Sequence, residues 1–146
     1  MRISLAAAMA LTLAAPAMAQ DKVALSRAVY VERAAPRGEG LARSIDRAES
    51  LRPGDRVVLM VEWQASEPGK GFTLSSPVPS ALAFQRSSAD GTEVSVDGGR
   101  NWGMLGTLRI GDRLASPEDV TNLRWRIPAR EAARGKGRVV FSAFVR

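Results

Sequence analysis

Apolar and polar residues alternate in short stretches along most of the chain, a pattern that predicts β-strands. The clearest stretch covers residues 56–63, where every second side chain is apolar. Its apolar face consists of Val57, Leu59, Val61 and Trp63. The opposite face mixes charged and apolar residues, as expected for a strand in the middle of a sheet whose second face is partly covered.

Similar but weaker patterns predict strands before and after this one. They cover residues 25–33, 41–49, 71–76, 81–86, 93–96, 101–105, 123–127 and 138–145. Residues 41–49 are heavily charged, which favours a weak edge strand. Turn signals separate the stretches, among them a tight hairpin at 97–100 and a single helical turn that begins at Ser116. About seven to nine short strands at close spacing predict an all-β fold, an antiparallel β-sandwich.

The first residues have the composition of a cleavable export signal. Met1-Arg2 is a short cationic start, residues 3–13 are mostly apolar, and Ala17-Met18-Ala19 offers small residues for cleavage before Gln20. The apolar run is shorter than the ~20 residues that a membrane anchor needs. We therefore expect a signal peptide at 1–19 and a single domain at 20–146 that is periplasmic or secreted, without stable membrane insertion.

The composition narrows the available chemistry. The chain contains no Cys and no His, so it lacks disulfides and the commonest ligands of zinc, copper and haem. We expect no metal and no cofactor. The net charge is +6, but export argues against a nucleic-acid partner and favours either ordinary solvated surface or an anionic envelope partner.

The candidate catalytic groups do not combine into a reactive set. Nothing in their spacing brings Glu118 and Asp119, or Asp97 and Asp112, together as an acid–base pair. The serines have no His to activate them. We therefore expect a protein that is not an enzyme and has no catalytic residues. An uncharacterised hydrolase that uses carboxylates is the third alternative.

Basic and aromatic residues suggest two candidate contact surfaces. Arg124 and Arg126 flank Trp125 and share one face of their strand, so they form a cationic strip with Arg138 if the two strands pair. This strip is the candidate surface for an anionic partner. The three Trp residues lie on or beside alternating stretches and are expected in the core, although a platform for stacking sugars is the alternative.

Several short segments together resemble a known family. They are Pro53-Gly54-Asp55, the following strand to Trp63, Pro77-Val78-Pro79 and Leu82-Ala83-Phe84. They resemble the bacterial conserved repeat domain of unknown function, an immunoglobulin-like module of exported and cell-surface proteins. The resemblance covers residues 51–145, with 123–145 as the closing pair of strands. It implies an immunoglobulin-like β-sandwich and no catalytic residues.

A second resemblance is confined to one turn. Ser95, Asp97, Gly99 and Trp102 match the pattern of the Asp-box found in sialidases and other β-propellers. In such a turn the Asp side chain binds backbone N–H groups, Gly takes a dihedral that other residues avoid, and Trp packs beneath. Because a propeller needs a chain several times longer, the motif predicts a structural hairpin and no glycosidase activity.

These observations predict an exported, non-catalytic structural or interaction module of the envelope or the extracellular space. Its partner is an unidentified protein or an envelope polysaccharide. The alternative is a small carbohydrate-binding module. Edge strands of a sandwich can accept another chain, so a homodimer or a partner complex can form by edge-strand pairing without any further motif.

Overall fold

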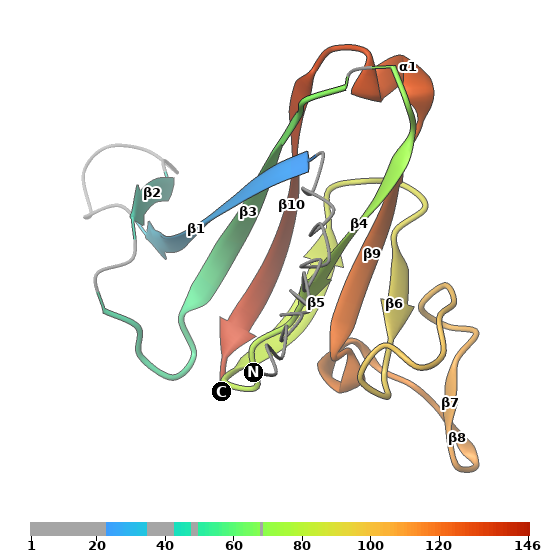
Figure 1. The fold of residues 1–146 in the computed structure, drawn as a ribbon. Helices are drawn as coiled ribbons and strands as arrows, with labels where there is room; N and C mark the ends of the chain where they lie inside the picture. Colours follow the sequence, from blue (N-terminus) through green and yellow to red (C-terminus); the bar gives the residue numbers. More distant parts are fainter. Residues whose placement is uncertain (1–22, 35–42, 48–49, 68) are drawn as a thin grey trace, which may run out of the picture.

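The chain forms an antiparallel all-β fold, shown in Figure 1. The computed structural model describes residues 23–34, 43–47, 50–67 and 69–146. The predicted fold class is confirmed at this level. The predicted signal at 1–19 lies outside the described residues. No helix in the described part of the chain is long and apolar enough to cross a membrane.

Five strands form the larger sheet, in the order β2-β1-β3-β10-β5. Their bounds are β1 Val23–Ala34, β2 Arg43–Arg47, β3 Arg56–Ala65, β5 Leu82–Ser87 and β10 Lys136–Val145. As the alternation of residues 56–63 predicts, β3 lies inside the sheet, between β1 and β10. The charged β2 lies at the edge, also as predicted.

Three strands form the smaller sheet, in the order β4-β9-β6. Their bounds are β4 Phe72–Pro77, β6 Glu93–Ser95 and β9 Asn122–Ile127. The two-residue strands β7 (Arg109–Ile110) and β8 (Arg113–Leu114) form a separate small hairpin. The helical turn predicted at Ser116 is the 3-10 turn η1, Pro117–Asp119.

The strand predicted at 101–105 does not form. Only Gly103 bridges to Val94, through two backbone hydrogen bonds of 2.8 and 3.1 Å. Asn101 and Trp102 are instead committed to the turn before it, where their side chains make hydrogen bonds. A local turn therefore replaces the second half of the predicted hairpin.

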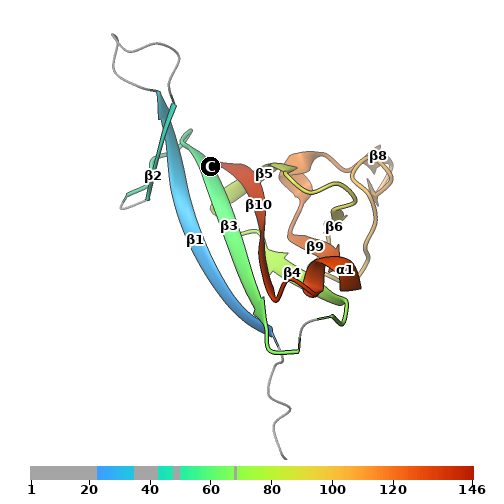
Figure 2. The ribbon, with the colours of Figure 1, turned by 90° about the horizontal axis from the view of Figure 1, so that it is seen from above.

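The two sheets pack against a common core and give a sandwich-like arrangement (Figure 2). The ring of Trp63 on β3 meets Phe72 on β4 at 5.1 Å, edge to face. Trp125 on β9 lies 6.2 Å from Phe141 on β10. These contacts place the start of β4 against the end of β3, and the middle of β9 against β10. The larger sheet therefore has two strands, β1 and β2, that extend beyond the smaller one.

The last two strands do not form the closing pair that the family resemblance implied. β9 belongs to the smaller sheet, whereas β10 belongs to the larger one. Between them Pro128 and the helical turn α1, Ala129–Ala132, carry the chain across, with Ala132 fully buried in the core. In the immunoglobulin arrangement the last two strands lie in one sheet, so the strand order here is different.

Candidate functional site

The Asp-box residues meet in one compact turn. Oδ1 of Asp97 accepts hydrogen bonds from the backbone N–H groups of Arg100 and Asn101 at 3.1 and 2.9 Å. It also accepts one from the Ser95 hydroxyl at 2.8 Å. These donors, led by the backbone N–H of Asn101, lower the pKa of Asp97 to about 2. The carboxylate is thus used to hold the turn.

Gly99 and Trp102 complete the turn. Gly99 has a φ of +90°, a region that side chains with a Cβ avoid. Its N–H donates to Ser95 Oγ at 2.9 Å, and its carbonyl accepts from Trp102 Nε1 at 2.9 Å. A Cβ at this position would lie 3.5 Å from the Trp102 ring. The four residues therefore form an internally bonded unit.

Two of the predicted contact arginines lie beside this turn. Arg124 and Arg126 donate to the same Glu93 carboxylate oxygen at 3.0 and 3.4 Å. The hydrogen bond from Arg124, with the smaller effect of Arg126, lowers the pKa of Glu93. The Arg124 guanidinium also lies 4.5 Å from the centre of the Trp102 ring. Only Arg126, with 77% of its side chain exposed, still faces solvent broadly.

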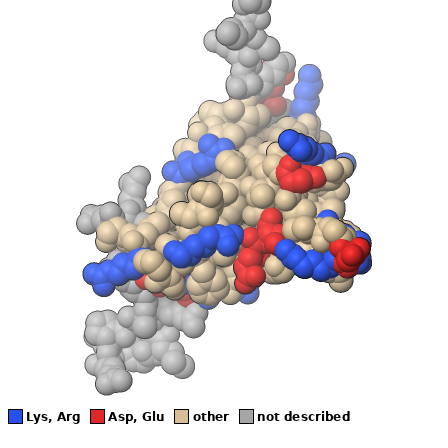
Figure 3. Space-filling model, turned by 90° about the horizontal axis from the view of Figure 1, so that it is seen from below, with Lys and Arg blue, Asp and Glu red and all other residues tan. Residues whose placement is uncertain are grey.

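The third arginine does not join them, so the predicted strip is not formed. Arg138 lies on β10, which pairs with β3 and β5, whereas Arg124 lies on β9. Both side chains alternate with buried core residues, so they point outward from opposite sheets. The condition that the strands pair is not met. On the face drawn in Figure 3, basic and acidic side chains are interspersed.

Asp119, one of the candidate carboxylates, makes structural contacts. Asp119 receives two hydrogen bonds from the guanidinium of Arg113, at 2.6 and 2.9 Å, and one from the Ser116 N–H at 2.8 Å. Arg113, followed by Ser116, lowers the pKa of Asp119 well below its usual range. No group of three potential metal ligands occurs among the residues that the structure describes.

The tryptophans do not form an exposed platform. Trp63 and Trp125 are only 2% and 3% exposed, and the Trp125 indole donates to Ser87 Oγ at 3.1 Å. Trp102 is half-buried beneath Arg124. The expected core position therefore holds for Trp63 and Trp125. The Nε1 atom of Trp63 is buried without a hydrogen-bond partner.

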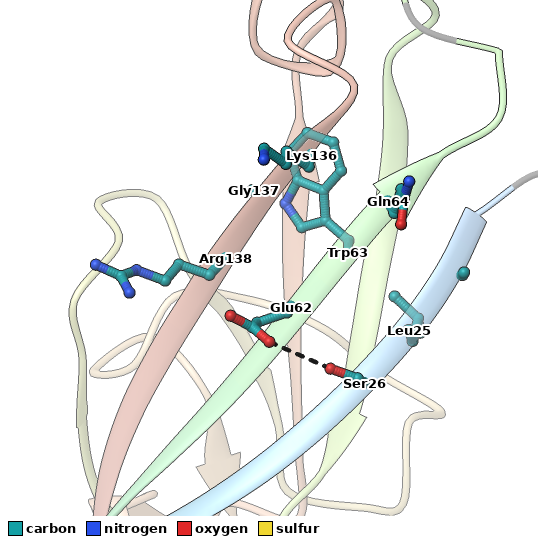
Figure 4. A pocket seen from close by; sticks show the side chains of 9 residues that line it. Leu25, Ser26, Glu62, Trp63, Gln64, Lys136, Gly137 and Arg138 are labelled. Carbon is teal, nitrogen blue, oxygen red and sulfur yellow. Dashed lines mark hydrogen bonds between the residues drawn. The ribbon is translucent and has the colours of Figure 1, made fainter.

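A groove that the sequence did not reveal crosses one end of the larger sheet (Figure 4). It has a volume of about 590 Å³ and spans three neighbouring rows of β1, β3 and β10. Its lining combines apolar surface from Leu25 and Trp63 with polar side chains, and Ser26 donates to Glu62 at 3.3 Å within it. Its floor includes Gly137, which lies opposite Trp63.

Exposed apolar side chains gather at two other places. The first is the segment 104–114, which includes the small hairpin of β7 and β8. Its side chains Met104, Leu105, Ile110 and Leu114 are 36–54% exposed. The second is the margin of the core beside β1, where Leu25 is 43% exposed although it faces the same side as the buried Trp63 opposite it. Neither place is visible in the sequence, because exposure depends on how far the second sheet extends.

No protein-family model, curated protein or solved structure matches the chain. Its function is therefore inferred from the side-chain geometry of the described residues.

Proposed function

We propose that the chain is an exported, non-catalytic β-sandwich module that binds another macromolecule in the periplasm or outside the cell. The observation that carries the proposal is the contrast between three carboxylates that are engaged within the molecule and a set of apolar side chains that are exposed. Asp97, Asp119 and Glu93 are each committed to internal hydrogen bonds or ion pairs. Seven large apolar side chains, by contrast, are at least 36% exposed. Exposed apolar surface of this kind favours contact with a partner.

The partner that this surface fits best is a protein. Sugar recognition usually needs an exposed aromatic ring, and each Trp ring here is buried or covered by Arg124. Among the exposed apolar side chains the only aromatic one in the described residues is Phe144, and a single Phe ring does not make a stacking platform. The carbohydrate-binding alternative therefore has less support, and envelope polysaccharide becomes a secondary partner class.

The chain is immunoglobulin-like only in its general architecture of two packed sheets, not in its strand order. Two antiparallel sheets around one core are common to many exported modules that share no strand order. This architecture agrees with the resemblance to the conserved repeat domain. Export itself is supported by the composition of residues 1–19.

The proposal can be tested by fractionation and capture. The tagged full chain is expressed in a bacterial host, and its location, N-terminal residue and bound material are determined together by mass spectrometry and glycan analysis. We expect a product that begins at Gln20 or Asp21 outside the cytoplasm and retains protein. A product confined to the cytoplasm would overturn the proposal, and retention of glycan alone would favour the carbohydrate-binding alternative.

A further inference from the structure

One long edge of the smaller sheet is unpaired among the described residues. β4 pairs with β9 on one side, and no described strand pairs with it on the other. The Val78 N–H donates to the Thr121 carbonyl on the β9 side at 2.8 Å. Because backbone groups alternate along a strand, those of Thr73 and Ser75 point to the unpaired side. Pro77, which has no N–H, has the same orientation, as is usual for Pro at an edge.

The core is open beside this edge. β4 lies over β3, so the next position in the smaller sheet lies over β1, where no described strand is present (Figure 2). Five of the partly buried apolar residues that pack on the core lie along this margin: Val23, Val29, Leu59, Ala65 and Phe72. With the exposed Leu25, they form an apolar strip at the distance from β4 that one more strand would cover.

The overhang of β1 and β2 restricts what can fill this position. A second copy that paired its own β4 antiparallel with this edge would place its β3 in the space that β1 already occupies. A partner with a second sheet beneath its edge strand meets the same obstacle. An extended segment without such a sheet fits, because it needs only the width of one strand.

The side chains of β1 also indicate the chemistry of that segment. On the face toward the opening, the exposed Arg27 lies between Leu25 and Val29 in the alternation. A segment with apolar side chains at alternate positions, and an acidic one among them, would match this row. Its outward positions would lie beside Thr73 and Ser75, which are polar and exposed.

We propose that β4 accepts an extended segment of another protein as an additional strand, with alternate apolar residues and one acidic residue packed on β1. This proposal rests on the proposed function and specifies its partner class and site. Backbone hydrogen bonds to the β4 edge provide affinity, and the side chains that enter the opening provide selectivity.

The test uses the full chain and a labelled synthetic peptide, acetyl-Val-Thr-Leu-Thr-Glu-Thr-Val-Thr-Leu-amide, with binding followed by fluorescence anisotropy. A peptide of the same composition without alternation is the first control. Two further peptides carry N-methyl groups on one or the other set of alternate amides. We expect saturable binding of the alternating peptide, and a loss of about tenfold or more when the amides that face β4 are methylated. The other methylated set should retain binding.

Protein variants locate the site. Ser75→Pro removes an N–H from the free edge, whereas Ser75→Ala keeps it, so only the first should weaken binding, by about tenfold. Leu25→Asp should weaken binding too, whereas Leu51→Asp, at a residue of nearly equal exposure (42% against 43%), should not. The N-methylated peptides leave the protein unchanged and keep the test valid if Ser75→Pro fails to fold.

Three results would overturn the inference. They are equal binding of alternating and non-alternating peptides, absence of peptide binding, and protection of the Ser75 amide from hydrogen exchange before any peptide is added. The last result would mean that the edge is already occupied, and size-exclusion chromatography would then show whether a second copy is the occupant. If the capture experiment succeeds while the peptide test fails, the proposed function stands and only strand addition is rejected.

Discussion

The indole ring of Trp63 lies directly against the backbone of Gly137, the residue opposite it on β10. A Cβ at position 137 would lie 2.4 Å from the ring, closer than any real contact of this kind. Trp63 is 2% exposed and also meets Phe72 of the other sheet. The absence of a side chain at residue 137 thus allows Trp63 to join the two sheets.

Gly137→Ala should therefore destabilise the fold. Overpacking of a buried site typically costs about 1–3 kcal/mol, which chemical denaturation can measure. In a background with Trp63→Leu the ring is absent, so the same Ala should cost much less. A double-mutant cycle should give a coupling of about 1 kcal/mol or more. Equal costs in the two backgrounds would contradict the contact.

Asp97 should make the stability depend on pH in a narrow acidic range. Its pKa is lowered from 3.8 to about 2 in the folded state. The carboxylate therefore contributes stability above about pH 4, and this contribution is lost as the pH falls toward 2. Asp97→Asn should lower the melting temperature at pH 6 and flatten its decline between pH 4 and pH 2.

Asp90→Asn is the matched control for this effect, because Asp90 is an exposed acid outside the Asp-box turn. Its melting curve should follow that of the unmodified chain at each pH, measured by circular dichroism. If both variants showed the same pH profile, the role assigned to Asp97 would be wrong.

The ion pair between Arg113 and Asp119 should restrain the small hairpin formed by β7 and β8. Asp119→Asn weakens the paired hydrogen bonds to the guanidinium, so this hairpin should open more often. Trypsin cleavage after Arg109 or Arg113 should accelerate by about fivefold. The neighbouring Glu118→Gln should have little effect, because Arg146 donates to the backbone carbonyl of Glu118, which this change leaves in place. Comparable cleavage of the two variants would contradict this restraint.

Tryptophan fluorescence tests the burial of the three rings. Trp63 and Trp125 should emit at short wavelength and resist iodide, since both are nearly fully buried. Trp102→Phe should remove most of the emission that iodide quenches. Addition of envelope glycans should leave the spectrum unchanged. A red shift or quenching on glycan addition would instead support carbohydrate binding.

The strands were largely predictable because alternation is a local property of the sequence. Residues 56–63 and 123–127 alternate cleanly, and both stretches became strands that pair on both sides. The alternation wrongly predicted a strand at 101–105, because Asn101 and Trp102 belong to the turn that Asp97 holds. The Asp-box residues were also found from the sequence, since the hydrogen bonds that join them to one another lie within a few positions of the chain.

The arrangement of the sheets was not predictable in the same way. No local pattern indicates that β9 and β10 lie in different sheets. The prediction that Arg124, Arg126 and Arg138 form one cationic strip was therefore wrong. The opening beside β4 depends on the unequal number of strands in the two sheets. Leu25 resembles any core residue in the sequence, and only the overhang of β1 explains its exposure.

The most direct test of the account is site-specific photo-crosslinking in the exported fraction. A photoreactive amino acid is placed at Thr73, on the free edge of β4, or at Glu118, which is exposed elsewhere. Thr73 should give an adduct with another protein, and the crosslinked segment identified by mass spectrometry should alternate apolar and polar residues. Glu118 should give none. Equal adducts from both positions, or adducts only with a second copy of the chain, would contradict the account.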